Sequence, residues 1–527
     1  MARGGIARVP PMSSNRPISE YEPVARGART GSARRRDGQD EEHGAEWTVT
    51  RPASQTDAGN APAEDSFDAA GAPPSSGKAE GSAQVGRRKK GGVLLKRGHA
   101  ISYAGLFLFT TFLYFRPYEL IPALSPLSSG AYYIALFTLA VFIPTQLAVE
   151  GTLSVRPREV TLVLLLTLFA LLSLPLAINP GEGWEAFVEY LKVVSMFVVM
   201  VNVVRTERRL KMLLLLVLAA SLMVSAAAIN DYRAGNLTVS GTRVGGIVGG
   251  MFGNPNDLAL HLSMMIPIAF GLMLSTRGAL KKLVYVGGAL LMGAALVVTF
   301  SRGGFLGMSA ASFVLAWKLG RRNRIAVVAA TLVVVALFLV LAPGEYAGRL
   351  ATIVGQADAT GSSGARQALL IRSIETTVKN PLLGVGMGNF HTVSLHEQVS
   401  HNAYTQVGAE MGVAAMLIYT LFVLSPFRRL RRIERETVAA HKGSRDYYLA
   451  VGFQASVVGY MVSSFFGSVA YLWYIYYLVG YAYCFARLYE ARAEASGTRV
   501  ATETQGERRA QQKARLRRLH ALSEEGE

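Results

Sequence analysis

The sequence predicts an all-α polytopic membrane protein with about twelve transmembrane helices. Hydrophobic residues make up 51% of the chain, and its mean hydropathy is +0.28. Long apolar runs alternate with short connectors that hold many of the lysines and arginines behind the formal net charge of +18. Because basic residues in that placement act as orientation signals, we expect no nucleic-acid partner.

Two tails are expected to flank the membrane domain. Residues 1–95 are rich in Ala, Gly, Pro, Ser, Arg and acids, so they cannot bury enough apolar surface to offset the entropy of ordering, and we expect a disordered cytoplasmic tail. No apolar signal-peptide core precedes Ile101. Residues 491–527 are expected to form a cytoplasmic basic tail, in which 508–522 would make a basic amphipathic helix on the inner membrane surface.

The transmembrane domain is expected at residues 96–490. Its spans fall near 101–115, 130–149, 160–178, 185–204, 210–229, 256–275, 283–300, 303–317, 325–342, 403–425, 447–466 and 470–488. Each of these runs approaches the length that a bilayer core requires.

The basic connectors predict the orientation of these spans. One alternating set of connectors holds about 26 Lys and Arg residues, and the other holds about 8 spread over more residues. The first set is therefore cytoplasmic, with both termini inside. One long outward loop, residues 343–402, lies between the ninth and tenth spans. We expect the chemistry there, because the loop ends in a histidine where the chain re-enters the bilayer.

Three arginines stand out because they lie on the outward side, which has few cations. They are Arg243 in a glycine-rich segment, Arg302 at the junction of two apolar runs, and Arg366 in the long loop. An arginine fork binds phosphate oxygens with parallel hydrogen bonds, so these residues are candidate phosphate ligands. The alternative is that each one reaches lipid phosphates or caps a helix carbonyl. Arg302 is the strongest candidate, because a charge held at interface depth is costly without a partner.

His401 is the candidate general base, because it is the outward histidine at the start of a span and a neutral imidazole accepts a proton near pH 7. A helix cap is the alternative role. Asn402, Gln406 and Glu410 follow at spacings of four and share one helix face. That polar stripe either orients the active site from behind or joins helices by hydrogen bonds, and we favour the second role for Glu410.

Other motifs indicate structure more than chemistry. Residues 252–257 (FGNPND) predict a turn and an N-cap for the sixth span, whose positive end would help to hold an anion. Residues 384–388 (GVGMG) predict a tight turn rather than a nucleotide site, because no strand-helix-strand unit surrounds them. The outward loops lack metal-ligand spacings, and the one cysteine, Cys484, excludes a disulfide framework and a cysteine-based metal site. We therefore expect no metal and no cofactor.

Taken in order, these motifs resemble those of the O-antigen ligase and polymerase family of bacterial inner membranes. The resemblance spans roughly residues 100–490. It rests on Arg243, on 252–256 (FGNPN), on 301–304 (SRGG), on Arg366, on 380–386 (NPLLGVG), and on 401–404 (HNAY) with 410–412 (EMG). The order of the motifs and their common membrane side are more specific than any one motif alone.

The resemblance implies an enzyme that moves a glycan from undecaprenyl diphosphate to an acceptor sugar hydroxyl on the periplasmic face, without nucleotide or metal. By similarity, His401 would deprotonate the acceptor, Arg243 and Arg302 would bind the leaving diphosphate, and Arg366 would bind substrate. Asn402 would support the site from behind. The expected partners are the lipid-linked donor, the glycan acceptor and membrane lipids.

Three alternatives for the function remain open at the level of the sequence. A ligase would use lipid A core as the acceptor, whereas an O-antigen or exopolysaccharide polymerase would use a second lipid-linked repeat. We favour the ligase because one long loop with a single His-Asn motif fits that branch. A lipid-linked glycan flippase, the third alternative, should have a polar path through the inner half of its spans, where this chain has mainly Leu, Val, Ala and Phe.

Overall fold

The computed structural model describes residues 99–495, apart from 238–242, 321–324, 326–328, 330–361, 395–396 and 441–443. The chain divides into two compact units, and every described residue belongs to the unit that includes Gly92–Glu527. The expected tail at residues 1–95, nearly all of the ninth span at 325–342 and most of the C-terminal tail lie outside the described residues.

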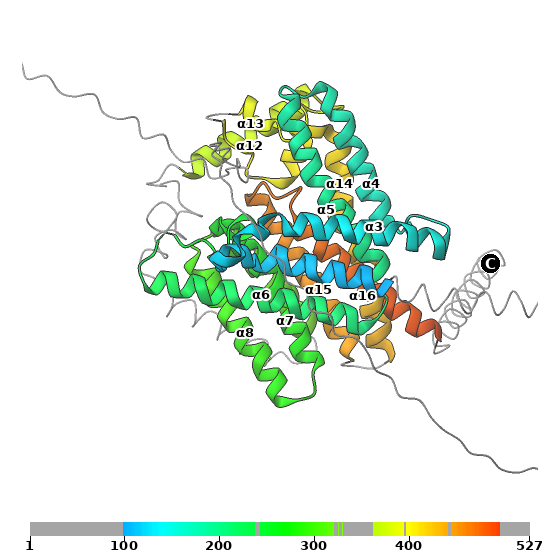
Figure 1. Cartoon of the computed structure of the whole chain (residues 1–527). Coiled ribbons are helices and arrows are strands. Elements are labelled where there is room, and N and C mark those ends of the chain that lie inside the picture. The colour runs from blue at the N-terminus through cyan, green and yellow to red at the C-terminus, as the bar shows by residue number, and fades with distance from the viewer. Residues whose placement is uncertain are drawn as a thin grey trace, which may run out of the picture. The chain divides into compact units, whose positions relative to one another are not determined.

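The described part of the chain is built from helices (Figure 1). The first helix covers residues 99–115. The others are α2 (Pro117–Leu120), α3 (Gly130–Glu150), α4 (Arg158–Ser173), α5 (Pro180–Val203), α6 (Glu207–Arg233), α7 (Pro255–Ser275), α8 (Ala279–Val298), α9 (Arg302–Gly320), α12 (Ser362–Lys379), α13 (Phe390–Val393), α14 (Ala403–Ala440), α15 (Arg445–Ser463) and α16 (Trp473–Ala495). The all-α prediction is confirmed for these residues.

Eight helices in the described residues are long and apolar enough to cross a membrane. They contain α3 to α8, α14 and α15. Three further expected spans are helical but fall short of that standard. The first has 17 described residues, the eighth is rich in Gly, Ser and Ala, and the twelfth is rich in tyrosine, which lowers its hydropathy. The count of twelve spans and their orientation therefore stay predictions.

Sequence signals place several of the helix starts. Asn179, Thr206, Asn254 and Ser444 are side-chain N-caps of α5, α6, α7 and α15. Proline follows the cap in α5 and α7, where its fixed φ favours the first helical position. The N-cap expected within residues 252–257 is therefore confirmed at Asn254, whose side chain accepts from the amide of Asn256 at 2.8 Å.

The core of the bundle is the pair of helices α7 and α15. In their apolar windows 78% and 72% of the residues are buried. Small and hydroxylated residues let the two helices approach closely, as is common in membrane bundles. Ser456 donates to the Met264 carbonyl at 2.6 Å, and the hydroxyls of Ser263 and Ser463 lie 3.2 Å apart.

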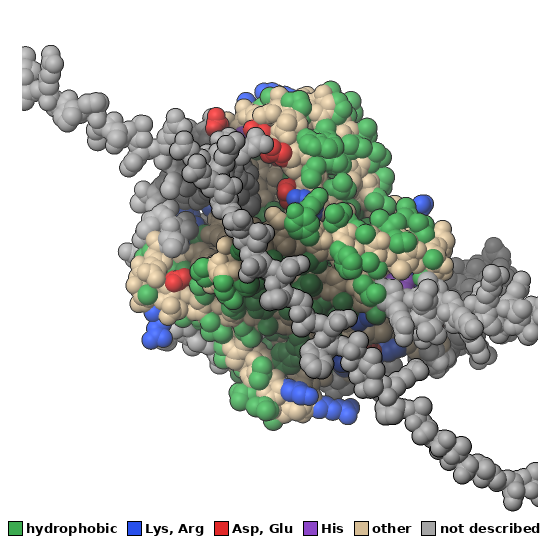
Figure 2. Space-filling view, in the orientation of Figure 1, with side chains coloured by type: hydrophobic (Ala, Val, Ile, Leu, Met, Phe, Trp, Pro, Cys, Tyr) green, Lys and Arg blue, Asp and Glu red, His purple; other side chains and the backbone are tan. Residues whose placement is uncertain are grey.

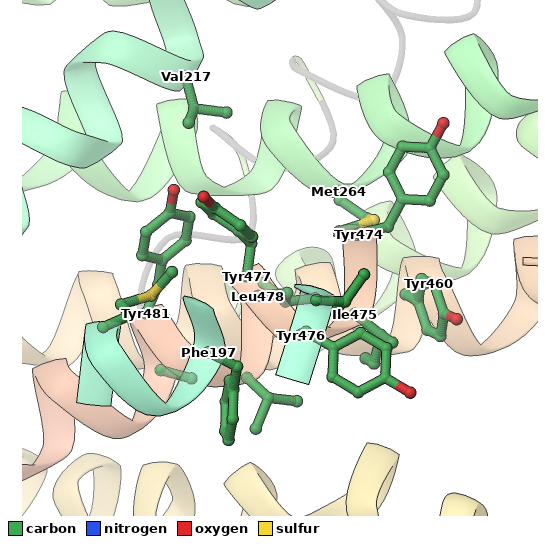
Figure 3. Close-up of a cluster of buried hydrophobic side chains, with 14 of the residues drawn as sticks. Phe197, Val217, Met264, Tyr460, Tyr474, Ile475, Tyr476, Tyr477, Leu478 and Tyr481 are labelled. Carbon is green, nitrogen blue, oxygen red and sulfur yellow. The ribbon is translucent and has the colours of Figure 1, made fainter. Parts of the chain in front are cut away.

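Aromatic side chains of α16 fill the space beside this pair. Figure 3 shows Tyr474, Tyr476, Tyr477 and Tyr481 projecting from one helix, with Phe197 and Tyr460 close by. The rings of Tyr190 and Phe197 on α5 contact Tyr476 with centroid distances of 5.7 and 6.4 Å. Such ring pairs add stability beyond the area they bury. Tyrosine thus makes α16 a buried helix despite its low hydropathy.

The outer helices expose large apolar side chains. Only 17% of the apolar window around α3 is buried, and Phe137 on that helix is 59% exposed. Leu280, Leu283 and Val284 on α8 are each at least 60% exposed. Figure 2 shows hydrophobic side chains over much of the visible surface. Apolar surface of this extent is typical of a protein that faces lipid.

The connectors predicted to be cytoplasmic come together in the structure. Lys318 at the end of α9 pairs with Glu434 on α14 at 2.5 Å, and Arg445 of α15 pairs with Glu207 of α6 at 3.0 Å. The α14 helix reaches this region because it continues to Ala440, beyond the predicted end of the span at residue 425. One end of the bundle is therefore tied together by ion pairs between its basic connectors.

Candidate active site

Arg243 is held at the start of α7. Its Nη2 donates to Asn256 Oδ1 at 2.8 Å, and its Nε donates to the Thr299 carbonyl at 3.1 Å. The same Asn256 oxygen accepts from the Ser301 hydroxyl at 3.0 Å. Three sequence motifs therefore meet at one amide: the glycine-rich segment, the α7 cap and the segment that carries Arg302. The sequence predicted the arginines but assigned residue 256 to the turn and N-cap of the sixth span rather than to the binding of an arginine.

The Arg302 side chain emerges from a tight turn between α8 and α9. The backbone of Phe300 has φ 51°, a left-handed conformation that is uncommon for a bulky residue. Ser301 then caps α9, because its hydroxyl accepts from the Gly304 amide at 3.2 Å. Arg302 is the first residue of α9 and is half-buried. It therefore lies one residue from the Ser301–Asn256–Arg243 cluster.

The connection between α15 and α16 joins this cluster to His401. Near its start, Ser463 donates to the Gly303 carbonyl at 3.3 Å. Near its end, the Ser468 hydroxyl accepts from the backbone amide of His401 at 2.9 Å and lies 3.2 Å from the Ser400 hydroxyl. The residues after Arg302 and the backbone of His401 thus contact the same short segment.

His401 precedes α14 in a strained conformation. Its φ is 52°, and its side chain is half-buried. Such outliers persist where the surrounding structure fixes them, and they cluster at functional sites. Asn402 follows as the cap of α14, since its Oδ1 accepts from the amides of Tyr404 and Thr405 at 2.9 and 3.1 Å. The Nδ2 of Asn402 is buried and has no acceptor in the part of the chain that the structure describes.

Arg366 is reached through α12, which runs alongside the first half of α14. Ser373 donates to Thr405 at 2.8 Å. Arg366 lies seven residues before Ser373, so it stands roughly 10 Å further along the α12 axis. The structure thus places Arg366 at the end of the bundle where α14 begins, on an element separate from the cluster of Arg243, Asn256 and Ser301.

The α14 helix is broken inside its apolar half. Gly412 has φ 87° and ψ 173°, which are not helical values. After the break, the Val413 amide donates to the Pro381 carbonyl at 2.9 Å. A Cβ at residue 412 would lie 2.3 Å from the Leu382 carbonyl oxygen. The break therefore requires glycine and receives residues of the loop that was predicted to face outward.

The loop also satisfies the carbonyls that the break frees. The Val385 amide donates to the Ala409 carbonyl at 2.9 Å, and the Gly386 amide donates to the Glu410 carbonyl at 3.0 Å. A buried carbonyl without such a partner would cost free energy. The turn expected at residues 384–388 is present, and its function is to dock onto α14.

Glu410 strengthens this docking with its side chain. Its buried carboxylate accepts from the Gly388 amide at 3.0 Å and from the Tyr471 hydroxyl at 2.7 Å. Glu410 thus joins the loop, α14 and the connection that precedes α16, which is the joining role that we favoured for it. His391 adds a tie to α5, since its Nε2 lies 2.9 Å from Glu182 Oε2. His396, a histidine of the same loop, lies outside the described residues.

Metal ligands do not gather in the described ranges: no three His, Cys, Asp or Glu side chains lie close enough to hold an ion. A reaction without metal stays a prediction.

Replacing Asn256 tests how the cluster holds together. We expect Asn256→Ala to lower the free energy of unfolding by about 1–3 kcal/mol, because Arg243 and Ser301 lose a shared acceptor. Thermal unfolding in detergent measures the change. Asn236→Ala is the control, since Asn236 is exposed and its side chain donates to the nearby Asp231 carboxylate at 3.4 Å. Equal midpoints for the two variants would contradict the prediction.

Comparison with known proteins gives one family. Residues 287–420 match the family model described as O-antigen ligase. The matched range includes Arg302, Arg366 and His401, and it ends within α14, after the break. A search of curated proteins gives no match to the sequence. Residues 287–420, which carry the candidate site residues Arg302, Arg366 and His401, are therefore similar to the O-antigen ligase family.

Proposed function

We propose that this protein transfers a glycan from undecaprenyl diphosphate to an acceptor sugar hydroxyl on the periplasmic face of the bacterial inner membrane. The first acceptor that we propose is lipid A core, as for an O-antigen ligase. One observation carries the proposal: Arg243, the turn before Arg302 and the His401 backbone are joined through Asn256, Ser301 and the α15–α16 connection. A network that ties together the segments of two arginines and a histidine suits a reaction with an anionic leaving group.

The proposed reaction is a direct displacement at the anomeric carbon. A neutral His401 imidazole takes the proton of the acceptor hydroxyl as its oxygen bonds to that carbon. The bond from the anomeric carbon to the diphosphate oxygen breaks, and the electron pair leaves with the diphosphate. Arg243 and Arg302 neutralise the charge that develops there. Release of the imidazole proton to water then restores the base.

Two further residues are proposed to bind substrate. Arg366 would contact the lipid-linked donor from a position near the start of α12. Asn402 would offer its Nδ2 to a sugar or phosphate oxygen, because this buried donor has no acceptor among the described residues.

The direct test uses purified protein in nanodiscs with an undecaprenyl-diphosphate-linked glycan, in EDTA. Lipid A core and a second lipid-linked repeat are offered as acceptors. We expect product on lipid A core, and we expect Arg302→Ala to lower its rate by roughly 10²-fold or more, as for loss of a charge-stabilising donor. Arg277→Ala is the matched control, because Arg277 is exposed in the connector between α7 and α8.

Each outcome of this test has one meaning. A ladder on the lipid-linked repeat would identify a polymerase of the same family instead of a ligase. Movement of the donor across the membrane without a new glycosidic bond would identify a flippase and overturn the proposal. Equal rates for Arg302→Ala and Arg277→Ala would remove Arg302 from the site.

A further inference from the structure

An arginine outside the matched range of residues 287–420 contacts the loop that carries Arg243. We propose that Arg116 and Glu119 are positioning residues for this loop, an inference that rests on the proposed function. Both residues lie just after the first helix, and Glu119 belongs to α2. The loop between α6 and α7, residues 243–253, is the element that they would hold.

The contacts are made to the tip of the loop. Glu119 Oε2 accepts from the Gly249 amide at 2.7 Å, and the Arg116 guanidinium forms an ion pair with the same carboxylate. The guanidinium lies against Gly250, where a Cβ would stand 2.8 Å from Arg116 Cζ. Gly250 has φ 60°, so the loop needs glycine here both for its backbone and for the arginine.

The backbone of Arg116 is itself strained. It has φ 43° and ψ 60° although Pro117 follows, and a residue before proline normally adopts an extended conformation. Four non-glycine residues in the described ranges have positive φ. Of the others, His401 belongs to the candidate site and Phe300 lies beside it. Strain of this kind survives where several contacts fix it, as they do at functional sites.

Hydrogen bonds within and around residues 243–253 connect the tip of the loop to Arg243. The Gly246 amide donates to the Phe252 carbonyl at 2.6 Å, and the Tyr474 hydroxyl donates to the Met251 carbonyl. The loop leads directly into the α7 cap, and Arg243 at its other end bonds to Asn256. A shift of the tip would therefore move the segment on which the guanidinium of Arg243 depends.

An ordinary surface ion pair would not have this arrangement. Exposed pairs spaced i, i+3 contribute little because water and salt screen them. The side chains of Arg116 and Glu119 are only 17% and 30% exposed. The Glu119 carboxylate also accepts a hydrogen bond from the backbone amide of Gly249, 130 residues away in sequence. The pair is thus part of a tertiary contact.

The first experiment needs no enzymatic activity. Hydrogen exchange of the intact protein in nanodiscs is compared for wild type, Arg116→Ala, Glu119→Gln and Arg432→Ala. We expect faster exchange at residues 244–253 in Arg116→Ala, and a smaller change in Glu119→Gln, which keeps an acceptor for Gly249. Arg432→Ala is the control, because it removes a helical pair with Glu436 at 2.8 Å on α14. Unchanged exchange at 244–253 in Arg116→Ala would overturn the inference.

The second experiment is a double-mutant cycle on glycan transfer. Arg116→Ala alone is expected to lower kcat/KM for the lipid-linked donor by roughly 10- to 100-fold, as for a misplaced binding group. In an Arg243→Ala background, Arg116→Ala should lower this kcat/KM by less than about twofold, because both substitutions act through the Arg243 guanidinium. If the fold losses in kcat/KM of Arg116→Ala and Arg243→Ala instead multiply in the double variant, the two residues act independently and the inference is overturned. If wild type transfers no glycan, the proposed function fails, and the exchange experiment still decides the role of Arg116.

Where Arg116→Ala does not fold, Glu119→Gln replaces it in both experiments. The expected order is then wild type, Glu119→Gln and Glu119→Ala in decreasing donor kcat/KM, with the KM of the acceptor unchanged. An acceptor KM that rises in parallel would indicate a general loss of structure and would contradict a specific role in holding Arg243.

Discussion

His401→Ala is expected to lower the rate of glycan transfer by roughly 10²- to 10⁴-fold, the usual contribution of a general base. The acceptor hydroxyl is a weak nucleophile at neutral pH and needs its proton removed as it attacks. The backbone amide of His401, the proposed base, donates to the Ser468 hydroxyl at 2.9 Å. Initial rates with saturating donor and acceptor measure the loss.

His401→Asn is the sharper variant for the same prediction. The native φ of 52° lies in the left-handed region, which asparagine tolerates better than most residues. It therefore removes the base with little added backbone strain, and we expect a loss as large as in His401→Ala at an unchanged unfolding midpoint. If either variant transfers glycan at the wild-type rate, His401 is not the base and serves only at the start of α14.

Gly412→Ala is expected to destabilise the protein by about 2–6 kcal/mol, which combines the cost of a strained backbone with that of an overpacked contact. The new Cβ would lie 2.3 Å from the Leu382 carbonyl oxygen, at a backbone φ of 87°. Relief of the clash would push residues 380–388 away from α14 and would expose the carbonyls of Ala409 and Glu410. The unfolding midpoint in detergent and the yield of folded protein measure the effect.

Gly293→Ala is the matched control for that experiment. Gly293 lies within α8, and a Cβ there would meet nothing within 4 Å. Alanine favours a helix interior over glycine, so this substitution should leave stability unchanged or raise it by about 0.5–1 kcal/mol. A Gly412→Ala protein that is as stable as Gly293→Ala would show that α14 can close into a continuous helix and would contradict the role assigned to the loop.

Local signals in the sequence predicted much of the helical framework. Apolar runs predicted the helices, because each helix presents a continuous apolar face to the core or to lipid. Asn254 and Pro255 predicted the start of α7. The break in α14 had no such local signal. The helical pattern continues on both sides of Gly412, and the donors and acceptors that stabilise the break come from residues 381–386, about 30 positions earlier.

Only part of the candidate site could be predicted, because some of its residues have a local signal and others depend on partners distant in sequence. Arg243, Arg302 and His401 were predicted because cations and histidine are rare on the outward side, so their residue type alone carries information. Asn256, Ser301 and Ser468 were missed as site residues, because polar residues in turns are common and their importance lies in partners distant in sequence. Arg116 was overlooked among the outward cations, although its place before Pro117 was visible.

The docking of residues 380–388 onto the broken α14 has a consequence for exchanging parts between related proteins. The loop and the first half of α14 complete each other's backbone hydrogen bonds at Val385, Gly386 and Val413. A chimera that replaces only the loop, up to residue 402, would combine a foreign loop with the native break in α14. The backbone groups at the break would then depend on partners from a different sequence. The smallest segment that can be transplanted as a unit therefore runs from α12 through residue 413, and it includes His401.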